Sequence, residues 1–170
     1  MRTKAIYSMI IVNLLLMSGC ESSERRANKA INVYSESIDS ISIEYKKILI
    51  DMAEKEYQRK LNDNEKKELD KFYEPIREKF EKNKLEAIAK IKLSGNGDAK
   101  IIETLRQIDQ ELLLDSRTAE NIKAKIAFDG YNRLLGKPTF EGDAALLMLE
   151  LKSKKLIQAK DKILIIVSQK

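Results

Sequence analysis

Residues 31–52, INVYSESIDSISIEYKKILIDM, decide the fold. Apolar and aromatic residues recur there at alternating spacings of three and four: Ile31, Tyr34, Ile38, Ile41, Tyr45, Ile48 and Met52. A seven-residue repeat over three heptads is typical of a helix that packs along its length against partner helices. Ile43, Leu49 and Ala53 widen the stripe beyond a two-stranded coiled coil, which favours a globular bundle. A helix over residues 28–61 would be about 50 Å long.

A second helix follows directly along the chain. Asn62 with Glu65 three residues later matches a capping box, which predicts a helix start at this point. The apolar residues that follow keep helical spacing to about Leu93. Pro75 lacks an amide hydrogen and disfavours helical geometry at the residue before it, so we expect a kink or a short break there.

Turn signals delimit two more helices. In the turn at 94–98, Gly95 is suited to a left-handed helix end and Asp98 to capping a third helix over about 99–135. Residues 136–138, Gly-Lys-Pro, end that helix, and a fourth begins near Asp143. The sequence therefore predicts an all-α fold, an antiparallel bundle of about four helices, which is elongated if 28–61 is one helix.

Two charged residues fall on the apolar stripes of the last two helices. Asp115 interrupts the stripe of the third helix and Lys160 that of the fourth. In an antiparallel hairpin whose loop centres between residues 139 and 140, Lys160 lies one turn, about 6 Å, from Asp115. This placement predicts a partly buried Asp115–Lys160 ion pair that sets the helix register. In the alternative, each side chain extends to solvent at a groove edge.

The residues for common site chemistry are missing. The 170-residue chain has no histidine and one cysteine, so zinc, haem and di-iron sites lack their usual ligands. We expect no catalytic residue, no metal and no cofactor; a carboxylate-dependent cell-wall hydrolase stays open as an alternative. Without Arg2 and Lys4, 30 basic residues face 27 acidic ones in mixed order, which argues against a nucleic-acid partner.

The cysteine closes a distinctive N-terminal pattern. Residues 1–4 are basic in character, residues 5–17 are mostly apolar, and residues 16–20 read LMSGC. This pattern resembles the signal of bacterial lipoproteins, in which an aliphatic residue stands three places before the cysteine and small residues fill the two places between. Met17 stands where leucine is usual, and Leu16 lies one place early. The resemblance covers the first 20 residues and implies cleavage between Gly19 and Cys20, with diacylglyceryl and N-acyl chains, such as palmitate, on Cys20.

The resemblance divides the chain into three parts. Residues 1–19 are the expected signal peptide, residues 20–27 a lipidated leash too polar to pack, and residues 28–170 the bundle domain. A transmembrane anchor needs about 20 apolar residues, and this run meets Glu21 too soon. An unlipidated secretory signal leaves the cysteine unexplained. The expected location is the bacterial cell membrane, with the protein lipid-anchored in the cell envelope or periplasm, and Glu21 after the cysteine favours the outer membrane in a host with two membranes.

A lipid anchor joined to a histidine-free bundle predicts a non-enzymatic binding module of the cell envelope, for example in exclusion, immunity or assembly. Its expected partners are the membrane and another envelope protein or glycan, with the oligomeric state open. Tyr131, Arg133, Lys137 and Phe140 form the candidate contact loop, since Tyr and Arg are favoured at binding hot spots. In the alternative, Phe140 only staples the loop to the next helix. The final Lys170 resembles that of short trimeric lipoproteins linked to peptidoglycan, so a structural tether is a second alternative.

Overall fold

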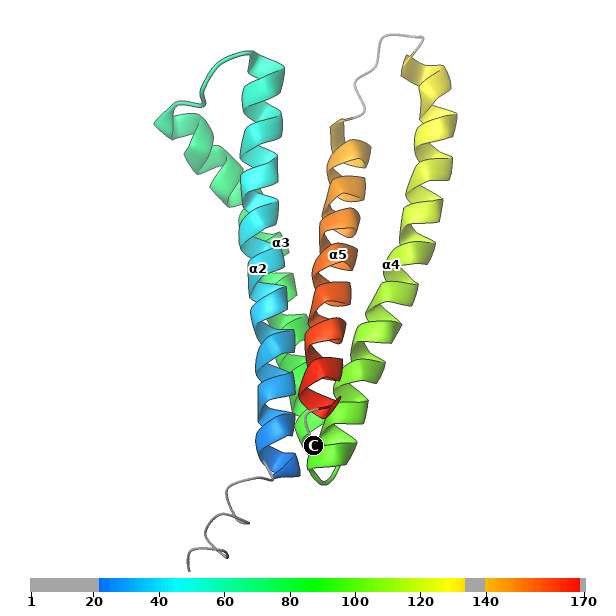
Figure 1. Cartoon of the computed structure of the whole chain (residues 1–170). Helices are drawn as coiled ribbons and strands as arrows, with labels where there is room; N and C mark the ends of the chain where they lie inside the picture. The colour runs from blue at the N-terminus through cyan, green and yellow to red at the C-terminus, as the bar shows by residue number, and fades with distance from the viewer. Residues whose placement is uncertain (1–21, 134–139, 169–170) are drawn as a thin grey trace, which may run out of the picture.

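The computed structural model describes residues 22–133 and 140–168, with side chains over 22–123 and 144–168. These ranges form four helices: α2 (Ser23–Tyr57), α3 (Asp63–Leu93), α4 (Gly97–Arg133) and α5 (Phe140–Ser168). Successive helices run antiparallel around a shared core (Figure 1). The described ranges contain no strand, so the predicted all-α bundle of four helices is confirmed. No helix within them is both long enough and apolar enough to cross a bilayer.

The packing centres on α2. Helix α2 packs against each of the other three helices, most extensively against α5, whereas the backbones of α3 and α5 do not meet in the described ranges. The larger core cluster draws buried residues from all four helices and surrounds the first half of α2. The smaller cluster, around Tyr45, Leu49 and Tyr73, involves α2, α3 and α5. Helix α4 leans away from α2 and α3 toward its C-terminal end (Figure 1).

The heptad pattern of α2 is confirmed over most of its length. Ile31, Tyr34, Ile38, Ile41 and Tyr45 are all buried. Beyond Tyr45 the buried position moves to Leu49, and Ile48 and Met52 are half-buried. A straight helix has 3.6 residues per turn, so the buried face drifts away from a strict seven-residue repeat. The prediction that Ile43 widens the stripe is wrong, since its side chain is 72% exposed.

Helix α2 begins five residues earlier than predicted. Ser22 caps it, because its hydroxyl oxygen accepts a hydrogen bond from the Arg25 amide at 3.3 Å. Ala27 is fully buried, and Glu24 accepts a hydrogen bond from Lys100 of α4 at 2.9 Å. The predicted leash over 20–27 is therefore wrong from residue 23 onward. The polar residues of this segment pack because the first turns of α4 supply their partners.

The capping box of α3 is confirmed. The Asn62 side chain accepts hydrogen bonds from the amides of Asn64 and Glu65 at 3.0 Å, and Glu65 accepts one from the Asn62 amide at 2.8 Å. Arg59 also hydrogen-bonds Glu65, and together with the Asn62 amide it lowers the pKa of Glu65 to about 2. Helix α3 runs unbroken through Pro75. The predicted short break is wrong, because Pro75 lies on the exposed face, where water can satisfy the carbonyl that loses its donor.

The turn between α3 and α4 follows the prediction in one residue and departs from it in another. Gly95 has the expected left-handed conformation, with a φ of 118°. The cap of α4 is Asn96, not Asp98: its side-chain oxygen accepts a hydrogen bond from the Ala99 amide at 3.1 Å. Asp98 is the second residue of α4, two positions after the cap, and it faces Arg26 of α2 at 3.7 Å. At the α4–α5 hairpin, α4 ends at Arg133, two residues before the predicted end. Helix α5 starts at Phe140, three residues before the predicted start at Asp143.

Candidate functional site

A cluster of polar side chains lies between α2, α4 and α5, and it consists of Tyr34, Gln107, Glu111, Asp115 and Lys152. Glu111 and Asp115 are four residues apart on α4 and share one face of the helix. The Lys152 ammonium of α5 lies 3.0 Å from both oxygens of Asp115 and 3.2 Å from Glu111. One cation therefore bridges two carboxylates across the α4–α5 contact.

The α2 side of this polar cluster is closed by Tyr34. Its ring is almost fully buried, and its hydroxyl donates a hydrogen bond to Glu111. Gln107 donates a second hydrogen bond to the same oxygen at 3.4 Å. Burial raises the pKa of Tyr34, and the neighbouring negative charge of Glu111 raises it further. Tyr34 is therefore a neutral donor that ties α2 to the carboxylates of α4.

Asp115 is the most deeply buried charge of the polar cluster, with 7% of its surface exposed. Burial raises its pKa, Lys152 opposes this rise, and Glu111 adds to it. Its Oδ2 atom is buried and has no partner with hydrogen-bond geometry among the described residues, although it contacts the Lys152 ammonium. Two carboxylates and one ammonium leave an excess of negative charge in a partly dry setting, which is costly unless the contacts hold their geometry.

The predicted Asp115–Lys160 pair is wrong in its partner. Asp115 is buried as expected, but Lys152 binds it, and Lys160 binds Asp109 at 2.6 Å on an exposed surface. Asp109 lies six residues before Asp115, about 9 Å along the helix. The midpoint between the end of α4 and the start of α5 lies earlier in the sequence than predicted. In addition, α5 begins lower along the bundle than the point at which α4 ends (Figure 1). Both displacements bring an earlier residue of α5 opposite Asp115.

The raised pKa of Asp115 implies a specific dependence of stability on pH. The folded protein holds a proton on this carboxyl more readily than the unfolded chain, where the pKa is about 3.9. The stability of the wild type relative to Asp115→Asn is therefore expected to rise as the pH falls from neutral through the raised pKa, and to level off below about 3.9. Urea unfolding of both proteins across this range measures the difference.

The comparison with Asp115→Asn cancels the effects of carboxylates common to both proteins. Glu65 is one of these: its pKa is lowered, so its stabilising contribution is lost as the pH falls toward 2. A stability difference between the wild type and Asp115→Asn that does not change with pH would contradict the buried position of Asp115. So would a wild type that loses stability relative to Asp115→Asn as the pH falls.

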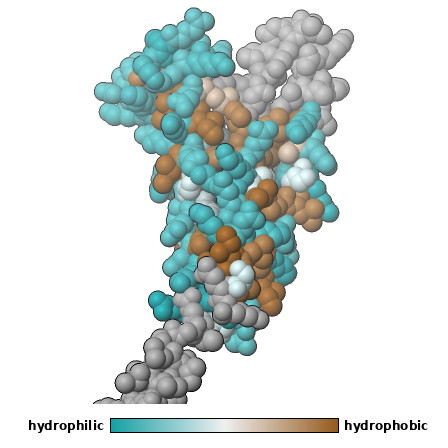
Figure 2. All heavy atoms as spheres, viewed as in Figure 1, coloured by the Kyte–Doolittle hydropathy of each residue, from teal (hydrophilic) through white to brown (hydrophobic). Residues whose placement is uncertain are grey.

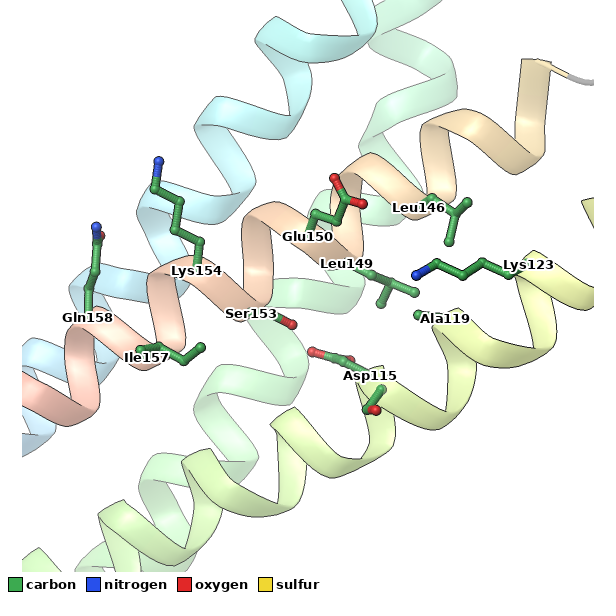
Figure 3. Close-up of a pocket in the computed structure, with 11 residues that line it drawn as sticks. Asp115, Ala119, Lys123, Leu146, Leu149, Glu150, Ser153, Lys154, Ile157 and Gln158 are labelled. Carbon is green, nitrogen blue, oxygen red and sulfur yellow. The ribbon is translucent and has the colours of Figure 1, made fainter.

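A groove between α4 and α5 lies beside the polar cluster and has a volume of about 560 Å³. Figure 3 shows Asp115 and Ala119 facing α5 from one wall and Leu149 and Ser153 facing α4 from the other. We call it the α4–α5 groove, and its main lining residues are Asp115, Ala119, Leu146, Leu149, Ser153 and Ile157. Its floor is mainly apolar, and Lys123, Glu150 and Lys154 stand at its rim (Figure 3). The groove thus combines apolar surface with one buried charge, as ligand and partner sites often do.

Several residues singled out from the sequence lie outside the described side chains. Tyr131 and Arg133 belong to the last turn of α4 and Phe140 is the first residue of α5, but only their backbone is described. Lys137, Gly19, Cys20 and Lys170 lie outside the described residues. The contact loop, the lipidation site and the peptidoglycan link therefore stay predictions.

Sequence reasoning identifies only Asp115 of the polar cluster and misses Tyr34, Gln107, Glu111 and Lys152. Lys152 lies beside the apolar stripe of α5 and not on it, and Tyr34 had been assigned to the apolar stripe of α2. One signal was available: Glu111 and Asp115 are two acidic residues at a spacing of four, so their shared face required a cation from a neighbouring helix.

The described residues offer no other obvious centre. Among the side chains described over 22–123 and 144–168, no group of three or more His, Cys, Asp or Glu is placed to hold a metal ion. Comparison of the chain with protein-family models, with curated proteins and with solved structures finds no match in any of the three.

Proposed function

We propose that this protein is a lipid-anchored helical bundle of the bacterial cell envelope that acts by binding another envelope component. The observation that carries the proposal is the LMSGC sequence at residues 16–20, directly before a folded domain. Helix α2 begins at Ser23, three residues after Cys20. A lipid on Cys20 would hold the bundle at the membrane surface, and two or more acyl chains give stable attachment where one is marginal.

The α4–α5 groove is the binding surface that this proposal assigns. Its apolar floor lies between the α4 and α5 helices, and an apolar groove between two helices accepts the apolar side of a third helix. Two of its three rim charges are basic, namely Lys123 and Lys154. The partner is therefore an apolar helical segment of another envelope protein, flanked by acidic residues that complement this rim.

Acylation of Cys20 is tested by metabolic labelling with an alkyne fatty acid. The wild-type protein is expected to incorporate the label and to fractionate with membranes, because the thiol is the lipid acceptor. Cys20→Ala is expected to lose the label completely. Label that persists in Cys20→Ala, or a wild-type protein without label, would refute the anchor.

The binding surface is tested with a photo-crosslinking side chain at Ile157, a half-exposed residue of the groove. Crosslinking in cells is expected to join this position to one envelope protein. Leu85 on α3 is similarly exposed and provides the matched control position. The adduct at 157 is expected to disappear when Leu146→Glu places a charge in the groove floor. Equal adducts at 157 and 85, or an adduct that survives Leu146→Glu, would assign the contact to another surface.

A further inference from the structure

One end of the bundle gathers both the start and the finish of the described chain. The first turns of α2, the α3–α4 turn and the last turns of α5 lie together there (Figure 1). We call this region, residues 22–29, 90–103 and 161–168, the anchored end. Ser23 is the third residue after Cys20, so the chain between the two spans at most about 10 Å. That reach is comparable to the Debye length at physiological ionic strength.

The anchored end exposes large apolar side chains. Leu93, the last residue of α3, is 86% exposed, and Ile102 in the second turn of α4 is 66% exposed. Leu164 and Ile165 in the last turns of α5 are also exposed. Figure 2 shows apolar surface among polar surface at this end of the molecule. Side chains of this kind gain free energy when they enter the boundary between lipid headgroups and acyl chains.

The charge of the anchored end is positive. It contains seven basic residues, Arg25, Arg26, Lys29, Lys90, Lys92, Lys100 and Lys162, against four acidic ones. The α2–α3 hairpin at the opposite end, residues 51–68, contains five basic and six acidic residues. The anchored end is therefore basic and partly apolar, whereas this hairpin is slightly acidic. Basic residues close to a membrane surface are attracted by anionic lipids, and their long stems can lie along the interface.

We propose that the anchored end lies against anionic lipid headgroups, with Leu93 at the headgroup level and Lys92 and Lys162 beside the lipid phosphates. The inference rests on the proposed anchoring through Cys20 and adds an orientation to it: the bundle stands on its basic end. The α4–α5 hairpin then points away from the membrane, which places the groove toward a partner within the envelope.

The test uses the acylated protein purified from membranes and reconstituted into vesicles of phosphatidylcholine with or without phosphatidylglycerol. The chain has one cysteine, which the lipid occupies under this proposal, so an engineered cysteine takes a nitroxide label at one position. Leu93→Cys labels the anchored end and Tyr57→Cys labels the opposite end, and both residues are exposed. Electron paramagnetic resonance then measures how often each label collides with an aqueous nickel chelate and with oxygen dissolved in lipid.

On anionic vesicles, the label at 93 is expected to lose collisions with the chelate and gain collisions with oxygen relative to the label at 57. Each basic residue near the surface contributes about fivefold to the association. The protection at 93 is therefore expected to vanish on pure phosphatidylcholine and in Lys92→Glu/Lys162→Glu. The matched control Lys66→Glu/Lys67→Glu makes the same change of charge at the opposite end and is expected to keep the protection.

Equal exposure of the two labels on anionic vesicles would overturn the orientation, and so would protection that ignores lipid charge. The intact mass of the same sample reports acylation separately. An acylated protein with an exposed label at 93 contradicts only the orientation, whereas a protein without acyl chains contradicts the anchor and the orientation with it.

Discussion

Lys152→Met is expected to lower the free energy of unfolding by about 3 kcal/mol. The substitution removes the one cation that contacts both Glu111 and Asp115 among the described side chains, and both carboxylates are mostly buried. Truncating one partner of a buried pair leaves an uncompensated charge, which costs more than the pair itself contributes. Methionine keeps most of the volume of the lysine stem, so the loss of packing stays small. Urea unfolding followed by circular dichroism measures the change.

A pair of double-mutant cycles identifies the partner of Asp115. Asp115→Ala combined with Lys152→Met is expected to cost far less than the sum of the two single changes, because the second change removes a charge that the first has left unpaired. Asp115→Ala combined with Lys160→Met is expected to be additive, and Lys160→Met alone to cost less than about 1 kcal/mol as an exposed pair. Additivity with Lys152 and coupling with Lys160 would restore the register predicted from the sequence.

Gly97→Ala is expected to destabilise the protein by about 1–3 kcal/mol. A Cβ atom at this position would lie 2.3 Å from the Ser23 carbonyl carbon and 2.5 Å from the Glu24 amide nitrogen. These are backbone atoms, so the first turn of α2 would have to move away from the start of α4. The same substitution at an unobstructed helical site normally stabilises a protein, because alanine has the higher helix propensity.

The sign of the effect at Gly97 therefore tests the close contact directly. Gln110→Ala on the exposed face of α4 is the control for the alanine side chain and is expected to change stability by less than about 0.5 kcal/mol. Hydrogen exchange is expected to show faster exchange of the Ala27 amide in Gly97→Ala, because the first turns of α2 lose their support. A Gly97→Ala protein more stable than the wild type would contradict the packing of α2 against α4.

The fold follows from signals that act locally along the chain. The repeat from Ile31 to Tyr45 marks the buried face of α2, and Asn62 with Glu65 marks the start of α3. Both signals depend on neighbours within a few residues, so a single sequence contains them. The start of α2 was missed because Glu24 and Arg26 find their partners on α4, at Lys100 and Asp98, about 75 residues away.

The polar cluster depends on the register between helices, which the sequence determines only weakly. Asp115 was recognised because it interrupts an apolar stripe on its own helix. The identity of its partner depends on where α4 ends and where α5 begins. A shift of α5 by two turns along α4 exchanges Lys160 for Lys152 as the residue opposite Asp115. Both lysines have long stems that bring an ammonium to a groove edge, so composition alone does not distinguish them.

Intact mass spectrometry of the protein purified from bacterial membranes tests the lipid anchor most directly. We expect a chain that begins at Cys20, with a mass equal to residues 20–170 plus a diacylglyceryl group and, when the amine is acylated, a third acyl chain. A chain that begins at Cys20 or elsewhere with an unmodified thiol, or one that retains residues 1–19, would contradict it.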